Sequence, residues 1–165
     1  MCAAALARHA GARVIGTMRS YAEEPAARTA GAHEVVLNDQ GLVERMKALA
    51  PEGVDHIVEV AFGANIDADV EMLKMGGSIG AYATDNATPK IPFWLMVFKN
   101  ICVFFLGSGD FPAEAKVAAT RDLNDVLQVG WAGFEIAESI PLAEIARAHE
   151  LVEHPVRRGR VVVTV

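Results

Sequence analysis

The stretch GARVIGTMRS, from Gly11 to Ser20, follows a helix-like run that starts at the first residue of the sequence. Gly11 is a typical helix stop, and the apolar run from Ala12 to Thr17 has the length of a buried strand. In a dinucleotide-binding α/β unit, a helix in this position is preceded by a first strand and a glycine-rich turn. We therefore expect a Rossmann-type domain to which this sequence contributes neither the first strand nor that turn.

After Thr17, amphipathic segments alternate with short apolar runs, which is typical of a parallel sheet with helices on both faces. The expected strands are residues 12–17, 34–37, 54–61, 78–83, 101–106, 134–140 and 160–165. The expected helices are residues 1–10, 22–30, 42–50, 66–74, 93–99, 113–129 and 142–153. Gly76 and Gly77 are expected to turn the chain before the strand at 78–83. The predicted fold class is α/β, with a tail of strand, helix and strand after the main sheet.

Composition favours one globular domain with an apolar surface that meets a partner. The sequence has 165 residues, is 52% hydrophobic and has a mean hydropathy of +0.25. Its formal net charge of −6 disfavours nucleic-acid binding, because phosphate contacts need clustered Lys and Arg. Arg157, Arg158 and Arg160 form the one basic cluster, which is interpreted either as a solvated turn or as a contact for an anionic ligand.

Cysteine usage and hydropathy predict the cellular setting. Cys2 and Cys102 form no short-spaced pair, which favours a reducing compartment such as the cytoplasm. The N-terminal alanine-rich run carries Arg8 where a secretion signal would be apolar. The apolar run from Ile91 to Leu106 is interrupted by Lys99, so we expect no membrane-spanning segment.

Six segments carry a resemblance to a known family over essentially the whole sequence. They are GARVIGT (Gly11–Thr17), AGAHEVV (Ala30–Val36), GVDHIVEVAFGANI (Gly53–Ile66), LKMGGSIGAYA (Leu73–Ala83), IPLAEIARAHELVE (Ile140–Glu153) and RGRVVVTV (Arg158–Val165). In this order they resemble the C-terminal half of the medium-chain dehydrogenase/reductase superfamily. Within it, they are similar to the NADPH:quinone oxidoreductase branch that includes zeta-crystallin.

The resemblance implies a domain at residues 1–130 that binds NADPH and a tail at residues 131–165 that returns to a separate catalytic domain. It also implies hydride transfer from NADPH to a quinone or a conjugated enone, generally without a catalytic zinc. The family's substrate-facing N-terminal domain has no counterpart in this sequence, so we expect weak or absent turnover by this chain alone. Two alternatives stay open. One is a non-catalytic dimerisation or scaffold module of the same fold, and the other is a fragment of a sister enzyme such as a zinc-containing alcohol dehydrogenase or an enoyl reductase.

The end of the strand at 12–17 predicts the choice of cofactor. An NAD-preferring fold usually has an acidic residue there to hold the ribose hydroxyl, whereas this sequence has Thr17, Arg19 and Ser20. A guanidinium and a hydroxyl suit a 2′-phosphate, which favours NADPH. Glu23 and Glu24 follow where the similar quinone reductases often have a lysine, and their negative charge would weaken phosphate binding.

The loops after the other strands are the second expected group of cofactor contacts, because ligands of open α/β sheets bind at the carboxyl ends of the strands. The resemblance implies that these loops contact the adenosine, the nicotinamide ribose and the nicotinamide ring in that order. The expected residues are Phe62, Gly63, Tyr82, Ala83, Leu106, Gly107 and Ser108. The alternative interpretation is that the glycines serve turns and the aromatic residues fill the core.

No cluster of acid, base or metal-ligating residues is evident in the sequence. The five histidines lie in different segments, and the spacing of His149 and His154 does not place both on one helix face. We therefore expect no metal site and no catalytic acid or base in this chain. Glu59, inside an apolar strand, is interpreted as the one carboxylate with an unusual pKa or as a structural acid whose hydrogen bonds are satisfied.

The strand at 101–106 predicts a partner surface. Val103, Phe104 and Phe105 give it apolar residues on both faces, although it is expected to be the last strand of the sheet. An exposed edge of this kind invites pairing with another chain. The resemblance implies the same, because dimers of this superfamily pair at this strand. We therefore expect a homodimer through Ile101 to Leu106.

Overall fold

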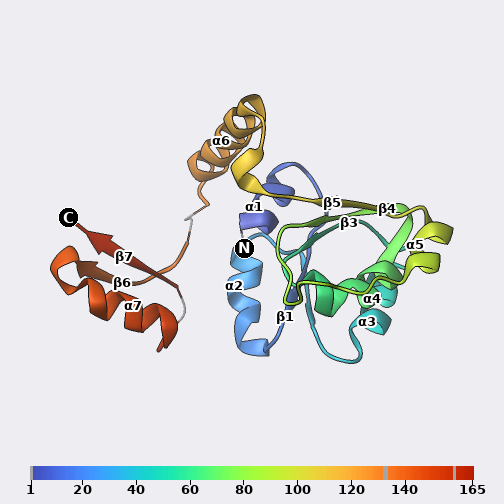
Figure 1. Ribbon diagram of the computed structural model, residues 1–165, viewed down its shortest axis with the longest axis horizontal. Coiled ribbons are helices and arrows are strands. Elements are labelled where there is room, and N and C mark those ends of the chain that lie inside the picture. The colour runs from blue at the N-terminus through green and yellow to red at the C-terminus, as the bar shows by residue number, and fades with distance from the viewer. Residues whose placement is uncertain (1, 132–133, 158) are drawn as a thin grey trace.

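The computed structural model describes residues 2–131, 134–157 and 159–165, in which helices and strands alternate along the chain (Figure 1). The strands are Ile15–Met18 (β1), Glu34–Leu37 (β2), Val54–Glu59 (β3), Leu73–Ala81 (β4), Cys102–Phe105 (β5), Ile136–Pro141 (β6) and Arg160–Thr164 (β7). The α-helices are Cys2–His9 (α1), Glu24–Thr29 (α2), Leu42–Leu49 (α3), Phe62–Met72 (α4), Phe93–Lys99 (α5), Ala113–Gln128 (α6) and Ile145–Glu153 (α7). Short 3₁₀ helices occupy Tyr21–Glu23 (η1), Ser108–Asp110 (η2) and Leu142–Glu144 (η3).

All strand pairs in the described ranges are parallel, as the predicted Rossmann-type fold requires. They form three hydrogen-bonded groups, β1 with β2, β3 with β4 and β5, and β6 with β7. The chain passes through a helix between one strand and the next from β1 to β5, so that each strand runs in the same direction. Figure 1 shows α3 and α4 on one side of the β3–β4–β5 group, while α1 and α6, which contact each other, lie on the other side.

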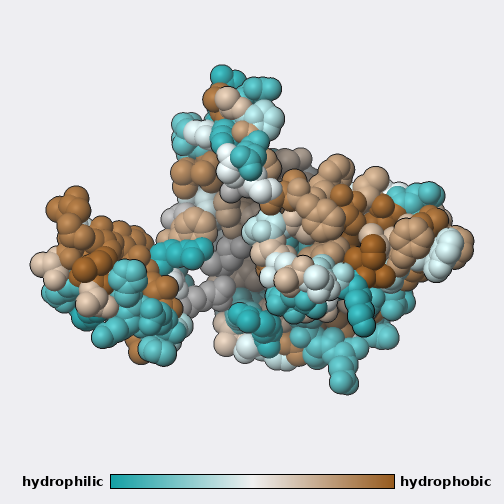
Figure 2. All heavy atoms as spheres, viewed as in Figure 1, coloured by the Kyte–Doolittle hydropathy of each residue, from teal (hydrophilic) through white to brown (hydrophobic). Residues whose placement is uncertain are grey.

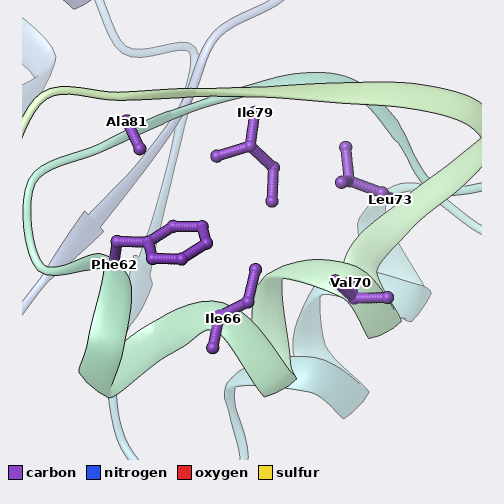
Figure 3. Close-up of a cluster of buried hydrophobic side chains, with 6 residues drawn as sticks. All are labelled: Phe62, Ile66, Val70, Leu73, Ile79 and Ala81. Carbon is purple, nitrogen blue, oxygen red and sulfur yellow. The ribbon is translucent and has the colours of Figure 1, made fainter. Parts of the chain in front are cut away.

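The core of the β3–β4–β5 group is formed by one face of α4. Phe62, Ile66 and Val70 follow one another at helical spacing, and each is at most 2% exposed. Figure 3 shows Phe62 and Ile66 facing Ile79 and Ala81 of β4, with Val70 and Leu73 at the other end of the same cluster. Burying a large aliphatic or aromatic side chain contributes roughly 1.5–3 kcal/mol. This apolar face therefore fixes α4 beneath the sheet.

A second apolar cluster joins two of the strand groups. Met46 of α3 and Met72 of α4 are both buried in it. Ile15 of β1 packs against the cluster from one strand group, and Ile57 of β3 packs against it from the other. The helices α3 and α4 thus hold β1–β2 and β3–β4–β5 in one layer, although β1 and β3 are not hydrogen-bonded to each other.

The C-terminal end of α4 is tied to α5 by a lysine. Lys99 Nζ donates to the carbonyl oxygens of Val70 (2.7 Å) and Glu71 (3.2 Å). The last carbonyls of a helix have no intrahelical partner and carry partial negative charge, so a cation is favourable there. Asn100 then ends α5 in the left-handed conformation, with φ of 51°.

Two expected boundaries around α4 are wrong. The helix starts at Phe62 rather than at residue 66, because Glu59 supplies hydrogen bonds for the turn before it. The next strand starts at Leu73 rather than at residue 78. The turn expected at Gly76 and Gly77 lies inside this strand, where the register of its pairing with β3 shifts. Gly76 has a φ of +71° there, a conformation that favours glycine.

In the tail, β6 and β7 form a two-stranded parallel sheet, and α7 lies between these strands in the sequence. Ile140 (0% exposed) and Ala148 (4% exposed) form its buried centre. Gly159 joins the helix to β7 with a φ of +125°, and a Cβ at this position would lie 2.6 Å from the backbone nitrogen of Ala137. Across the described residues, no helix has the length and apolar content needed to cross a membrane.

Candidate functional site: the carboxyl ends of the parallel strands

Main-chain hydrogen bonds bring the loops after β3, β4 and β5 together at one edge of the sheet. The bonds are Tyr82 N to Glu59 O (3.2 Å), Phe62 N to Ala83 O (3.2 Å) and Leu106 N to Ala81 O (2.9 Å). Seven of the expected cofactor residues lie in or beside these loops. This edge is the position at which open α/β sheets bind ligands.

Phe62 lies in the core, in agreement with the packing alternative. Its side chain is 2% exposed, and its ring meets that of Phe105 edge to face with the centroids 5.3 Å apart. Edge-to-face aromatic pairs contribute about 0.5–1.5 kcal/mol beyond their burial. Phe62 therefore supports the loops from below, and its side chain presents almost no surface to a ligand.

Gly63 is closely covered by the loop that follows β4. Its N–H donates to Thr84 Oγ1 at 3.1 Å, and Thr84 Oγ1 donates in turn to the carbonyl oxygen of Asn86 at 3.1 Å. A Cβ on Gly63 would lie 2.7 Å from Asp85 Oδ1. The absence of a side chain thus lets the two loops approach each other.

Tyr82, Ala83, Leu106 and Gly107 form the open part of the site. The Tyr82 side chain is 57% exposed and Leu106 is 39% exposed. No heavy atom lies within 4 Å of a Cβ built on Gly107, so its backbone is accessible. Ser108 begins η2, and its side chain lies outside the described part of the structure.

Arg19 and Ser20 lie at the end of β1, in the other strand group. Ser20 Oγ accepts from the N–H of Ala22 at 3.3 Å and caps η1, whereas Thr17 is exposed on β1. The N–H of Arg19 donates to Glu23 Oε2 at 2.9 Å, so this carboxylate folds back onto the loop. Glu24 is instead paired with Arg28 on α2 at 2.8 Å. Of the two acids expected to repel a phosphate, Glu23 is therefore the one that shares the loop with Arg19.

Glu59 organises the turn between β3 and α4. It is 5% exposed, and its Oε1 accepts from the N–H of Val60 at 2.6 Å and from the N–H of Ala61. The side-chain amide of Asn65 donates to both carboxylate oxygens at 3.1 Å. These bonds replace the side-chain cap that Ala61, at the start of α4, lacks. Glu59 is thus a structural acid whose hydrogen bonds are satisfied.

Asp69 has a strongly raised pKa, whereas the sequence interpretation considered only Glu59, either as a carboxylate with an unusual pKa or as a satisfied structural acid. Asp69 is 3% exposed, and burial raises its pKa to about 8, with further contributions from the negative charge of Glu59 and from their hydrogen bond. Among the described residues, its Oδ2 has no hydrogen-bond partner. The sequence carries a signal for this site, because Asp69 stands three residues after Ile66 and four before Leu73, in the apolar face of α4.

Together, the parallel strands, the helices on both faces and the converging loops define a Rossmann-type nucleotide-binding fold. The family model described as zinc-binding dehydrogenase matches residues 1–121. The chain belongs to this family, within the medium-chain dehydrogenase/reductase superfamily.

Curated relatives are quinone oxidoreductases. The protein from Homo sapiens is 26% identical over 159 residues, which cover 93% of this chain and 47% of the relative. The protein from Pongo abelii is 25% identical over 160 residues, with the same two coverages. The chain therefore spans about half the length of the curated relatives it matches.

Solved structures of similar fold include enzymes with different cofactors. A mycobacterial quinone oxidoreductase has a TM-score of 0.89 at 20% identity, covering 99% of this chain and 52% of its own. A mycobacterial protein complexed with NADPH has a TM-score of 0.79 at 20% identity, with coverages of 98% and 52%. An NAD-dependent alcohol dehydrogenase has a TM-score of 0.80 at 22% identity, with coverages of 99% and 47%. These similarities show the fold.

The described residues do not form a binding site for the zinc ion after which the family is named. In residues 2–131, 134–157 and 159–165, no three His, Cys, Asp or Glu side chains come together in a way that could hold a metal ion. Cys2 and Cys102 are both free thiols. We therefore derive no chemical step through zinc for this chain.

The raised pKa of Asp69 predicts how stability depends on pH. Its pKa lies at about 8 in the folded protein and near 3.8 in the unfolded chain, so between these values the folded state binds one more proton. The D69N variant keeps the side chain neutral at all pH values. The unfolding free energy of the wild type should fall relative to D69N by about 1.4 kcal/mol per pH unit from about pH 5 to 7.5, and should level off above about pH 8.5.

Urea denaturation of both proteins across this pH range measures the difference. The matched control is D67N, since Asp67 is an exposed residue of the same helix. D67N should show no such relative slope. Parallel pH profiles for D69N and the wild type would mean that Asp69 is ionised in the folded protein at neutral pH.

Proposed function

We propose that this chain is the cofactor-binding part of an NADPH-dependent quinone oxidoreductase. The observation that carries the proposal is the loop at the end of β1, where Arg19 and Ser20 stand in place of the acid typical of NAD-binding folds. Both residues are exposed, so a guanidinium and a hydroxyl are accessible to a 2′-phosphate. The quinone oxidoreductase relatives support the choice of reaction.

In the proposed complex, the loops after β3, β4 and β5 contact the adenosine, the nicotinamide ribose and the nicotinamide ring. The backbone of Gly107 is accessible for a close approach to the ligand, while Tyr82 offers an exposed ring and hydroxyl. When bound, NADPH supplies a hydride, which together with a proton from water reduces a quinone to the hydroquinone. The role of this chain is then to bind and orient the cofactor.

The division into residues 1–130 and 131–165 is part of the same proposal. The β6–α7–β7 unit closes on its own sheet, and apolar residues remain on its outside, including Val152 (66% exposed) and Val156 (79% exposed). Such residues suit contact with the catalytic domain that the proposed whole enzyme contains. The two free cysteines suit a reducing compartment, and we propose a cytoplasmic location.

Thermal unfolding with NADPH and with NADH tests the cofactor assignment, because a ligand that binds only the folded state raises the melting temperature. We expect NADPH to raise it more than NADH does. The difference should vanish in R19A and persist in R121A, which removes an exposed arginine from α6. The E23Q variant should bind NADPH about 2- to 10-fold more tightly, since it removes a negative charge beside the phosphate site.

Equal shifts with both nucleotides in the wild type would contradict the assignment to NADPH. If neither nucleotide shifts the melting temperature at millimolar concentration, the chain does not bind the cofactor alone. That result would favour the second candidate function, a non-catalytic dimerisation module of the same fold.

A homodimer through β5 is the partner interaction that we propose. In the described sheet, β5 pairs with β4 on one side and has no strand on the other. Phe104 is 54% exposed and Phe105 is 71% exposed along this strand. Further aromatic surface, Phe93, Trp94 and Phe98, lies on α5 (Figure 2, right). Pairing of two β5 strands would cover unpaired main-chain groups and this apolar surface together.

Sedimentation velocity at micromolar concentration checks the dimer. The wild type should sediment as a dimer, and F104K should sediment as a monomer, because a charge at the pairing edge opposes association. The V156K control changes an exposed valine of the tail in the same way and should remain dimeric. A monomeric wild type would contradict the proposal.

A further inference from the structure

Three polar side chains gather between the end of β3 and the first turns of α4. Glu59 is 5% exposed and Asp69 is 3% exposed. The side-chain amide of Asn65 donates to both carboxylate oxygens of Glu59 at 3.1 Å, and Asp69 follows Asn65 one helical turn later. We call Glu59, Asn65 and Asp69 the carboxyl cluster.

The carboxyl cluster needs one proton to be stable in its buried position. Among the described residues, Oδ2 of Asp69 is buried and has no hydrogen-bond partner. Two adjacent buried carboxylates repel each other, so one of them takes up a proton. A protonated Asp69 becomes a donor to Glu59, which keeps its own negative charge for the N–H groups that it accepts.

In the part of the chain that the structure describes, no cation offsets a second negative charge in the carboxyl cluster. Burial and the charge of Glu59 raise the pKa of Asp69, and no basic side chain opposes them. The charged or titratable groups on the elements packed against α4 are engaged elsewhere or exposed. They are Lys47 of α3 with Glu71, Arg45 of α3 with Asp39, Lys74 of β4 with Asp55, His56 of β3 with Ser78, Lys99 of α5 with the last carbonyls of α4, and the exposed Glu44 of α3.

The packing decides which side of the carboxyl cluster moves when the proton is lost. Ile66 (1% exposed) and Val70 (0% exposed) fix α4 on either side of Asp69, and Figure 3 shows both in the core. The main chain of Glu59 is fixed by its pairing with β4. Its side chain, in contrast, bonds to the N–H of Val60, a residue that is 53% exposed. Repulsion from an ionised Asp69 should therefore turn the Glu59 carboxylate outward to solvent.

Such a movement reaches the carboxyl edge of the sheet. When the Glu59 carboxylate leaves, the N–H groups of Val60 and Ala61 lose their acceptor. The same turn continues to Gly63, whose N–H donates to Thr84 Oγ1 at 3.1 Å in the loop after β4. The carboxyl cluster is thus connected to two of the loops at the edge where open α/β sheets bind ligands.

We propose that Asp69 is a positioning residue for this edge: a proton shared with Glu59 holds the turn before α4, and its loss at mildly alkaline pH releases the turn and weakens nucleotide binding. Asp69 acts through Glu59 and touches no ligand. On deprotonation, the hydrogen bond from Asp69 to Glu59 breaks and the proton passes to water. The effect on the nucleotide rests on the proposed function, whereas the movement of the turn is a property of the chain alone.

Carbon-detected NMR of the isotope-labelled chain without nucleotide tests the movement of the turn. The carbonyl carbons of Val60 and Ala61 should shift together with the side-chain carboxyl carbon of Asp69, with a midpoint at about pH 8. In D69N the two main-chain signals should stay constant over this range, because the amide has no proton to release. The control D67N removes an exposed acid from the same helix and should keep the wild-type titration.

Fluorescence titration with NADPH tests the effect on the site. In the wild type, the dissociation constant should rise about 10-fold from pH 7.5 to 9.5, because the form with the released turn binds weakly. In D69N it should change by less than about 2-fold over the same range, since this variant has one charge state at the cluster. D67N should follow the wild type.

Two results would overturn the proposal. One is a turn whose signals do not follow Asp69 or titrate equally in D69N, and the other is the same pH dependence of NADPH affinity in the wild type and D69N. If D69N does not fold, the wild-type spectra alone still show whether Val60 and Ala61 follow Asp69. A turn that titrates with Asp69 in a chain that binds no NADPH would support its positioning by the shared proton and contradict only the proposed function, so the two failures are distinguishable.

Discussion

The apolar cluster shared by α3 and α4 is the interaction on which the rest of the nucleotide-binding layer depends. Met46 and Met72 bury their side chains between β1–β2 and β3–β4–β5, which have no hydrogen bond joining β1 to β3. This packing therefore keeps the loop with Arg19 in the same layer as the loops after β3, β4 and β5. Interiors are close-packed, so such contacts fix relative position as well as contribute stability.

A buried polar cluster has the corresponding role at the ligand-facing edge. Glu59 holds the turn into α4 through main-chain hydrogen bonds, and Asn65 and Asp69 reach it from the first turns of the helix. Since two adjacent buried carboxylates are not both charged without a large cost, the raised pKa of Asp69 keeps one of them neutral at physiological pH. The turn before Gly63 is therefore held by a pair of carboxyl groups, Glu59 and Asp69, of which Asp69 is the protonated one at physiological pH.

Local patterns predicted the alternation of strands and helices, because glycine stops and apolar runs act over a few residues. They also placed the expected site residues at strand ends, where Tyr82, Leu106 and Gly107 are exposed. They left open whether Phe62 contacts the cofactor or fills the core, and they did not predict that Asp69 faces Glu59, because both outcomes depend on residues distant in sequence. The early start of α4 has a local cause instead, because Glu59, three residues before Phe62, accepts hydrogen bonds from the N–H groups of Val60 and Ala61.

Hydrogen exchange of the free chain, resolved by residue, tests whether β1 and β3 have unpaired edges. Asn38 N donates to Met18 O and Tyr82 N donates to Glu59 O, so the alternate residues Gly16 and Ile57 face β2 and β4, respectively. The amides of Thr17 and Val58 face the sides of β1 and β3 on which the described structure has no paired strand, and they should exchange at least 100-fold faster than those of Gly16 and Ile57. Local opening exposes paired amides only rarely, whereas unpaired ones exchange without it. Equal protection of the two sets would contradict the split layer described above and would mean that β1 and β3 are paired in solution.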